Sequence, residues 1–433
     1  TVGVGDRLGI ATDGHIRAFE KYDALPVFAQ QSIRELNLTH RTFEDVLDSA
    51  TFAVYRNGFR RGFGADGDHL KTPEEVEYAL RCGYTMITLD CSEHIRNDVA
   101  GMTDEEVRAE AKPDKALRDR YLGRSFGIGE GAALAFDGMS FLRMVLIYGG
   151  AIDFAAKIYG EHIKDKAARV DFEISIDETD TPTTPLQHFF VASELLRRGV
   201  KVATIAPRFC GEFQKGINYR GDLGQFEKEL KVHAIIARHF GYKLSIHSGS
   251  DKFSVFELIG RYTRGNFHLK TAGTSWLEAM KLVAMRDPAL YREIHAYALT
   301  AFGEARKYYH VTTDLSRIRS REAFRRRAPG ALLPGRREAA HPHHLRPDPQ
   351  RKGSGRKLPI QRQALLALEE GTRGIREAAR GAYRQAPRRA LPRNREIAVQ
   401  RLRTPLPRSP GNREPAGRYK IYRKQKGFPD GKI

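Results

Sequence analysis

Gly64-Ala65-Asp66-Gly67-Asp68-His69 is the stretch that decides the fold, together with the distant Ser245-Ile246-His247-Ser248-Gly249-Ser250. Each stretch closes an apolar run with acidic or imidazole side chains, and a break in the apolar pattern follows it. Parallel strands end in this way at the mouth of a β/α barrel, where such folds carry their chemistry. We therefore expect Asp68, His69 and His247 to converge on one site.

Short apolar runs alternate with longer stretches of helical period up to about residue 315. This alternation is typical of βα units around a parallel sheet, and a closed barrel needs eight strands. The candidate strands are Arg7–Thr12, Gly62–Asp66, Thr85–Asp90, Arg169–Ile176, Val202–Ala206, Lys243–His247, Asn266–Leu269 and Tyr309–Thr313. The sequence predicts a (β/α)8 TIM-type barrel over residues 1–319.

The segment between the third and fourth of these strands holds roughly 80 residues, which is too long for a single crossover. Thr103–Ala111 and Met139–Tyr159 have the pattern of helices, and the glycine-rich Ser125–Gly131 lies between them. A flexible loop is favoured for this segment over a phosphate cradle, because the lysine of a P-loop is missing. We expect a helical insertion after the third strand, over the barrel mouth.

Polar side chains recur at every second residue of several candidate strands. In Asp171–Asp177 this alternation places Asp171, Glu173, Ser175 and Asp177 on one face. Lys243–His247 and Phe267–Lys270 repeat the pattern with imidazole and ammonium groups. In a barrel the apolar face of a strand meets the helices, so the polar face lines the interior and builds a site.

The net charge of +20 suggests nucleic acid at first sight, but its distribution argues against this partner. Residues 321–433 hold 30 Lys and Arg against 9 Asp and Glu, whereas residues 1–320 have a net charge of −1. We expect residues 320–433 to be a basic tail that is disordered or frameshifted. Codons that encode His341–Asp348 can, when read one base further on, encode Ile-His-Ile-Thr-Tyr-Gly-Leu-Ile. This is an ordinary apolar segment, which favours the frameshift.

Three cysteines, Cys82, Cys91 and Cys210, cannot pair evenly and have no zinc-finger spacing. A reduced, cytoplasmic location fits this count. We find no apolar run near the ~18 residues of a membrane span and no leader, so we expect no membrane partner.

Imidazole is the commonest side-chain ligand for a divalent metal cation in proteins. His69 and His247 both lie at the ends of candidate strands and are therefore candidate metal ligands. A buried histidine that only makes hydrogen bonds is the alternative for each. His268 and His310 are rival ligands. The helical histidines, which we expect to pack or to lie at the surface, are His188 and His295.

Asp68 adjoins a candidate ligand, where a carboxylate can exchange protons with a bound substrate. Glu173 is the second candidate acid or base, with Asp177 as its neighbour. A salt bridge to a basic residue at the barrel mouth is the alternative role for each carboxylate. Lys270 and Arg208 would suit a substrate carboxylate.

Gly67-Asp68-His69-Leu70 and His247-Ser248-Gly249-Ser250 resemble the motifs of metal-dependent class II sugar aldolases. Residues 1–319 as a whole more closely resemble the tagaturonate epimerases of hexuronate catabolism. The segments that carry this resemblance are GDRLGIATDGHIRAF (5–19), FGADGDHLKTPEE (63–75), FEISIDETDTPTTP (172–185), APRFCGEFQKG (206–216), SIHSGSDKFS (245–254) and FHLKTAGTSWLEA (267–279).

The resemblance implies an isomerase with Asp68 and Glu173 as the acid/base pair and His69 and His247 as ligands of a divalent metal cation. Gln214 falls where the class II aldolases place another ligand, although a plain hydrogen-bonding role stays open for it. The implied substrate is a small keto sugar acid, D-tagaturonate or D-fructuronate.

These two epimers differ at a carbinol one carbon beyond the ketone's α-carbon, which enolisation cannot invert. A retro-aldol cleavage can, because the aldehyde fragment turns before the enediolate adds to its other face. A transient oxidation would also serve, but no convincing nucleotide-binding loop is present. The alternative functions are a class II aldolase that releases its fragments and a nucleic-acid-binding protein that uses the tail.

Overall fold

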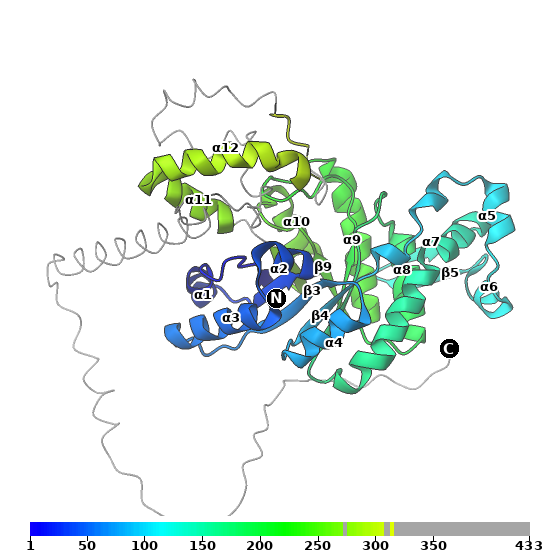
Figure 1. Cartoon of the computed structure of the whole chain (residues 1–433). Coiled ribbons are helices and arrows are strands. Elements are labelled where there is room, and N and C mark those ends of the chain that lie inside the picture. The colour runs from blue at the N-terminus through cyan, green and yellow to red at the C-terminus, as the bar shows by residue number, and fades with distance from the viewer. Residues whose placement is uncertain (272–274, 307–311, 316–433) are drawn as a thin grey trace, which may run out of the picture. The chain divides into compact units, whose positions relative to one another are not determined.

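Eight parallel strands form a closed barrel in the order β1-β10-β9-β8-β7-β4-β3-β2. The computed structural model describes residues 1–271, 275–306 and 312–315, and Figure 1 shows β3, β4 and β9 of this barrel. The strands are β1 (Val2–Val4), β2 (Pro26–Ser32), β3 (Gly64–Leu70), β4 (Met86–Asp90), β7 (Asp171–Ile176), β8 (Thr204–Pro207), β9 (Lys243–Ile246) and β10 (Phe267–Thr271). The predicted TIM-type barrel is confirmed.

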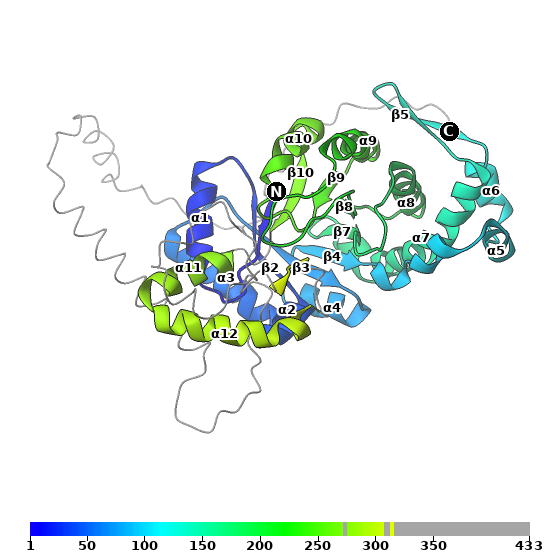
Figure 2. The same cartoon turned by 90° about the horizontal axis from the view of Figure 1, so that it is seen from above.

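Helices follow the strands and cover the outside of the barrel, as Figure 2 shows for α8, α9 and α10. They are α1 (Thr12–Lys21), α2 (Ile33–Thr39), α3 (Phe43–Asn57), α4 (Pro73–Arg81), α7 (Gly138–Ile158), α8 (Pro185–Arg197), α9 (Leu223–Phe240) and α10 (Phe253–Thr263). The last two described helices, α11 (Ser275–Arg286) and α12 (Pro288–Ala305), pack against each other around a small apolar cluster of their own. Local signals begin several of them. At α4, Thr72 and Glu75 bond each other's backbone N–H groups, and Pro73 occupies the first turn.

The strands separate apolar from polar side chains as their alternation predicts. Ile87, Phe172 and Ile174 are buried in the main apolar core. Thr88, Glu173 and other polar groups of the same strands are also fully buried, and they meet one another through hydrogen bonds inside the barrel. The barrel interior is therefore polar at the level of the predicted site.

The first predicted strand, Arg7–Thr12, is wrong. The Asp6 carboxylate accepts hydrogen bonds from the backbone N–H groups of Ile10, Ala11 and Thr12, and this folds the segment into a turn before α1. Two strands that the sequence patterns missed, β1 and β2, stand in this part of the barrel. The barrel closes between β1 and β10, where Val2 pairs with Leu269.

The eighth predicted strand, Tyr309–Thr313, lies mostly outside the described residues, and its described part, Thr312 and Thr313, is not in a strand. The predicted tail, residues 320–433, and its boundary at residue 319 also lie outside them, so both stay predictions.

The insertion follows β4, which is the third predicted strand and the fourth of the barrel. It contains α5 (Asp104–Glu110), α6 (Lys115–Tyr121) and an antiparallel pair, β5 (Ser125–Gly129) and β6 (Ala132–Ala135). The expected loop at Ser125–Gly131 is therefore largely a strand. Glu130, in the turn between β5 and β6, forms ion pairs with Arg238 and Arg264, which lie near the C-terminal ends of α9 and α10. In a β/α barrel these helix ends lie at the side opposite the mouth. The expected position over the mouth is therefore wrong for this hairpin, whereas Asn97 near the start of the insertion accepts a hydrogen bond from the backbone N–H of Asp180 in the loop after β7.

One apolar stretch, Gly138–Lys166, has the length and mean hydropathy of a membrane span, contrary to the expectation that no run approaches one. Its charged residues, among them Arg143 and Asp153, interrupt the pattern. Its buried side chains recur at intervals of three and four residues, and α7 packs against α8. This is the pattern of a helix that covers a barrel.

Candidate active site

A cavity of about 370 Å³ opens at the carboxyl ends of the strands. The charged and imidazole groups that line it come from several strands and the loops after them, and no lining residue comes from the insertion after β4. They are Arg34, Glu35, Asp68, His69, Asp177, Glu178, Arg208, Glu212, Lys215, His247 and Lys270. The predicted convergence of Asp68, His69 and His247 is therefore present in the structure.

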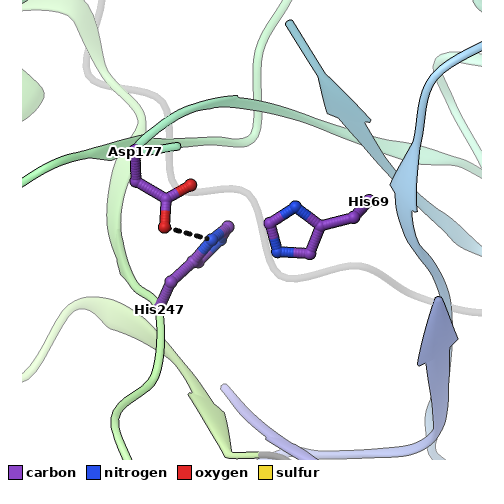
Figure 3. A group of neighbouring side chains, drawn as sticks. All are labelled: His69, Asp177 and His247. Atoms are coloured by element: carbon purple, nitrogen blue, oxygen red, sulfur yellow. Dashed lines mark ion pairs between the residues drawn. The ribbon is translucent and has the colours of Figure 1, made fainter. Parts of the chain in front are cut away.

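His69, Asp177 and His247 face one another across the cavity (Figure 3). One possible ligand atom from each residue lies within 4.8 Å of the other two. The two imidazole rings have centroids 4.9 Å apart, and Asp177 Oδ2 lies 3.1 Å from His247 Nδ1. Two imidazoles and a carboxylate form a donor set that suits a divalent cation.

A second group shares His69 with Asp90 and Glu178, and its ligand atoms also lie within 4.8 Å of one another. His69 Nδ1, Asp90 Oδ2 and His247 Nδ1 are buried, and no partner in the described ranges gives them a well-oriented hydrogen bond. Buried polar atoms normally have such a partner. The contacts that these atoms do make are ion pairs, His69 Nδ1 with Asp90 Oδ2 at 3.4 Å and His247 Nδ1 with Asp177 Oδ2 at 3.1 Å. A cation could replace the imidazole protons of these pairs, so the residues present fit the metal that the sequence predicts.

The backbone of β3 places both Asp68 and His69 at the mouth. The register between β3 and β4 shifts between Gly67 and Leu70, and His69 has a φ of 53°. A non-glycine residue at positive φ is uncommon and clusters at functional sites. In a regular strand neighbouring side chains point to opposite faces, so this irregularity lets two adjacent residues serve one cavity.

Lys270 lies at the centre of a buried carboxylate cluster. Its Nζ lies 2.9 Å from Asp66 Oδ2, 2.7 Å from Asp68 Oδ1 and 2.9 Å from Glu173 Oε1. The ammonium also donates to Thr88 Oγ1, and Thr88 Oγ1 donates to Asp66 Oδ1 at 2.9 Å. Since three carboxylates occupy Lys270, the structure does not favour the predicted role in binding a substrate carboxylate.

This cluster sets the protonation of its carboxyl groups. Burial alone would raise the pKa of Asp68, but the Lys270 ammonium and then His69 hold it well below its usual range. For Glu173, Lys270 and His247 overcome burial in the same way and lower its pKa. Burial dominates at Asp66 and raises its pKa to about 6. Asp68 is therefore an ionised base at neutral pH.

The two imidazoles carry protons in this arrangement. Burial would lower the pKa of His69, but Asp68 and Asp90 raise it to about 9. Asp177 and Glu173 likewise overcome burial at His247 and raise its pKa to about 10. Because a metal ligand must be neutral imidazole, binding of a cation here would release protons.

Glu173 lies beneath the cavity floor and is fully buried. Its Oε1 lies 2.8 Å from His247 Nε2, and Thr204 Oγ1 donates to its Oε2. Asp177, which the sequence marked only as a neighbour of Glu173, lines the cavity instead. Direct proton transfer between Glu173 and a substrate is not favoured by this position.

Gln214 lines the same cavity, but its side chain has hydrogen-bond partners. Gln214 Oε1 accepts from the backbone N–H and the hydroxyl of Thr312, each at 3.2 Å. Its Nε2 donates to Glu212 Oε2 at 3.3 Å. The structure therefore supports the hydrogen-bonding alternative, and metal ligation by Gln214 stays a prediction.

The remaining predicted histidines lie elsewhere. His268 is buried with Nδ1 2.8 Å from Thr1 Oγ1 and belongs to neither of the possible metal groups, and His310 lies outside the described residues. His188 in α8 packs as expected, with Nδ1 2.9 Å from His233 Nδ1 and Nε2 2.6 Å from the Tyr242 hydroxyl.

Asp66, Thr88 and Asp90 are site residues that sequence reasoning missed. For the two aspartates a signal was available, because Asp66 shares a strand face with Asp68, two residues further on, and Asp90 ends an apolar strand. Thr88 gave no comparable signal, since a threonine is ordinary in a strand.

Comparison with known proteins identifies relatives over the barrel region. The family model for tagaturonate epimerase (UxaE) matches residues 1–333. The tagaturonate/fructuronate epimerase of Thermotoga maritima is 49% identical over 322 residues, which cover 73% of this chain and 66% of the relative.

Two crystal structures of the fructuronate-tagaturonate epimerase UxaE from Cohnella laeviribosi are also similar. The complex with one glycerol is 54% identical with a TM-score of 0.73, and the native form is 53% identical with a TM-score of 0.72. Each comparison covers 74% of this chain and 66% of the other. The chain thus spans just under two thirds of the length of these relatives.

Proposed function

Because the chain belongs to the tagaturonate epimerase family, we propose that it interconverts D-tagaturonate and D-fructuronate with the help of a divalent metal cation. The observation that carries this proposal is the meeting of His69, Asp177 and His247 beside Asp68 at the barrel mouth. The names of the relatives supply the substrate pair, and the chemistry of the cavity agrees with it.

His69, His247 and Asp177 would hold the cation, with Asp90 and Glu178 as further donors beside His69. A bound divalent cation supplies Lewis acidity for the negative charge that develops on the ketone side of the substrate. Glu173 bonds Nε2 of His247 and fixes the orientation of that ring, as the outer partners of metal-binding histidines do.

Asp68 acts as the base in a retro-aldol inversion. It takes the proton of the carbinol hydroxyl while the bond from that carbon to the ketone's α-carbon breaks. The bond electrons pass to an enediolate, and the carbinol carbon becomes an aldehyde. After the aldehyde turns, the bond forms on its other face and Asp68 returns the proton. Lys270 keeps Asp68 ionised for the first step.

Arg208 is the side chain that we assign to the substrate carboxylate. It follows β8 directly and lines the cavity, and the part of the chain that the structure describes shows no carboxylate oxygen within 4.0 Å of its guanidinium. The other candidate, Lys270, is occupied by three carboxylates. A guanidinium binds a carboxylate in a bidentate manner.

The test uses the full chain, stripped of metal by a chelator and then supplied with one divalent cation at a time. We expect ¹H NMR to show D-tagaturonate forming from D-fructuronate only in the supplied samples. A folded protein that forms no epimer with any cation would contradict the proposal. Accumulation of free three-carbon products would favour the class II aldolase alternative.

Deuterated water separates cleavage from deprotonation. In a retro-aldol inversion the hydrogen on the carbinol carbon stays with the aldehyde, so the epimer should contain no deuterium at that carbon. Deuterium at the inverted carbon would refute the cleavage mechanism while leaving the epimerase assignment in place.

The cytoplasm is the location that we propose for this activity. Cys82, Cys91 and Cys210 are all free thiols in the structure, as expected for a protein of a reducing compartment. Fractionation of the source cells with an antibody against the chain would test this location, and recovery outside the cytoplasmic fraction would contradict it.

A further inference from the structure

Lys252 is a fully buried lysine beside the active-site cavity. Its Nζ donates to three backbone carbonyl oxygens, those of Gln214, Ile217 and Ser250, each at 2.8 Å. An ammonium has three N–H donors, so this cage satisfies all of them. A buried charge is tolerated only when it is compensated in such a way.

The three carbonyl groups belong to two different loops. Gln214 and Ile217 lie between β8 and α9, whereas Ser250 lies between β9 and α10. Lys252 immediately precedes α10, but its side chain does not cap that helix. It reaches across to the other loop instead, so its ammonium ties the two loops together.

A second contact supports the same junction. The side-chain oxygen of Asn218 accepts hydrogen bonds from the backbone N–H of Ser254 at 3.2 Å and from its hydroxyl at 3.1 Å. The loop after β8 is thus fastened to the start of α10 at two neighbouring points.

Both loops form walls of the cavity. Gln214 and Lys215 line it from the first loop, and His247, Ser248 and Ser250 line it from the second. Neither loop is a regular helix or strand, and Ser248 and Asp251 have φ values of 49° and 61°. Their relative position must come from specific contacts, because a continuous hydrogen-bond ladder is missing between them in the described structure.

We propose that Lys252 is a positioning residue, whose ammonium acts as a tethered cation that fixes the Gln214 loop against the His247 loop and so sets the width of the substrate cavity. Rings of backbone carbonyl oxygens bind free monovalent cations in the same way. The cage should therefore accept an unattached ammonium when the side chain is removed.

The experiment is chemical rescue of the Lys252→Ala protein. This change removes three carbons and the nitrogen, which n-propylammonium restores. Lys252→Met is the matched variant that cannot be rescued, because its uncharged side chain, which ends one atom short of the ammonium position, fills the space that the propyl chain of the amine would need. Lys228→Met, at an exposed position of α9, is the control for loss of a lysine.

We expect Lys252→Ala to lower the midpoint of thermal unfolding, Tm. Tens of millimolar n-propylammonium should raise the Tm of this variant, whereas n-propanol should not. The ammonium should leave the wild type, Lys252→Met and Lys228→Met unchanged. If n-propylammonium raises the Tm of Lys252→Ala no more than it raises the Tm of the wild type, the proposal is overturned. If Lys252→Ala does not fold, a Lys252→Met protein with wild-type Tm and KM would overturn it.

The catalytic part of this inference rests on the proposed function. KM for the hexuronate should rise by roughly tenfold to a hundredfold in Lys252→Ala, the range expected for loss of buried hydrogen bonds, with a smaller change in kcat. The same amine should restore KM. If the wild type has no epimerase activity, the proposed function fails, but the Tm measurements still decide the role of Lys252.

Discussion

Replacement of Lys270 by methionine tests the carboxylate cluster that supports Asp68. The change keeps an unbranched side chain, one atom shorter than lysine, and removes a charge that lies within 3 Å of Asp66, Asp68 and Glu173. Removing one partner from a buried ion pair costs about 3–5 kcal/mol, since the other charge is left uncompensated. Three carboxylates share this ammonium, so we expect a loss near 5 kcal/mol at pH 7.5 by that rule.

The loss should become smaller as the pH falls. In the wild type, Lys270 holds the pKa values of Asp68 and Glu173 below those of the unfolded chain. Their stabilising contribution is present above the unfolded pKa of about 4 and is lost as the pH falls toward the lower folded values. In the variant, burial raises these pKa values, so the folded state takes up protons and gains stability in acid.

Urea denaturation of the chelator-treated proteins at pH 7.5 and pH 5 measures this difference. Lys228→Met is the control, and its free energy of unfolding should stay within about 0.5 kcal/mol of the wild type. A Lys270→Met loss below about 1 kcal/mol at pH 7.5 would refute the reasoning, because it would match an exposed ion pair instead. So would a loss that increases toward pH 5.

Further variants test the site and the buried histidines. Asp68→Asn should keep its metal while turnover falls by roughly 10²–10⁴, whereas His69→Ala should lose metal and activity together. Metal analysis and kcat, measured on the same samples, distinguish the two roles. A His69→Ala protein with its full metal content would contradict the role of His69 as a ligand. Arg208→Gln should raise KM for the hexuronate by roughly tenfold or more but leave KM unchanged for the matching ketohexose without a carboxylate; an equal effect on both substrates would contradict its role. His188 and His233 have pKa values lowered by burial, that of His233 to about 3, so their neutral forms stabilise the fold above pH 6.5 and this contribution is lost as the pH falls toward 3. His233→Gln should therefore reduce the slope of unfolding free energy against pH by up to about 1.4 kcal/mol per pH unit between pH 6 and 4, and an unchanged slope in urea denaturation would exclude His233 as its source.

The sequence by itself determined the barrel architecture and the two stretches that carry the site, one with Asp68 and His69 and the other with His247. Alternation along Asp171–Asp177 indicated a polar barrel interior, and the structure buries Glu173 there. Thr72, Pro73 and Glu75 are local signals in the sequence that begin α4. These signals could be recognised because strand period and helix capping depend on residues only a few positions apart.

The tertiary structure alone decided how the site is held. Lys270 meets Asp68 across 202 positions of the chain, and Lys252 joins two loops through backbone oxygens that carry no sequence signal. His69 shares the cavity with its neighbour because its backbone takes a positive φ where the register of β3 shifts. Such contacts depend on strand register and barrel closure, which arise from packing between distant segments, and a local pattern does not contain them.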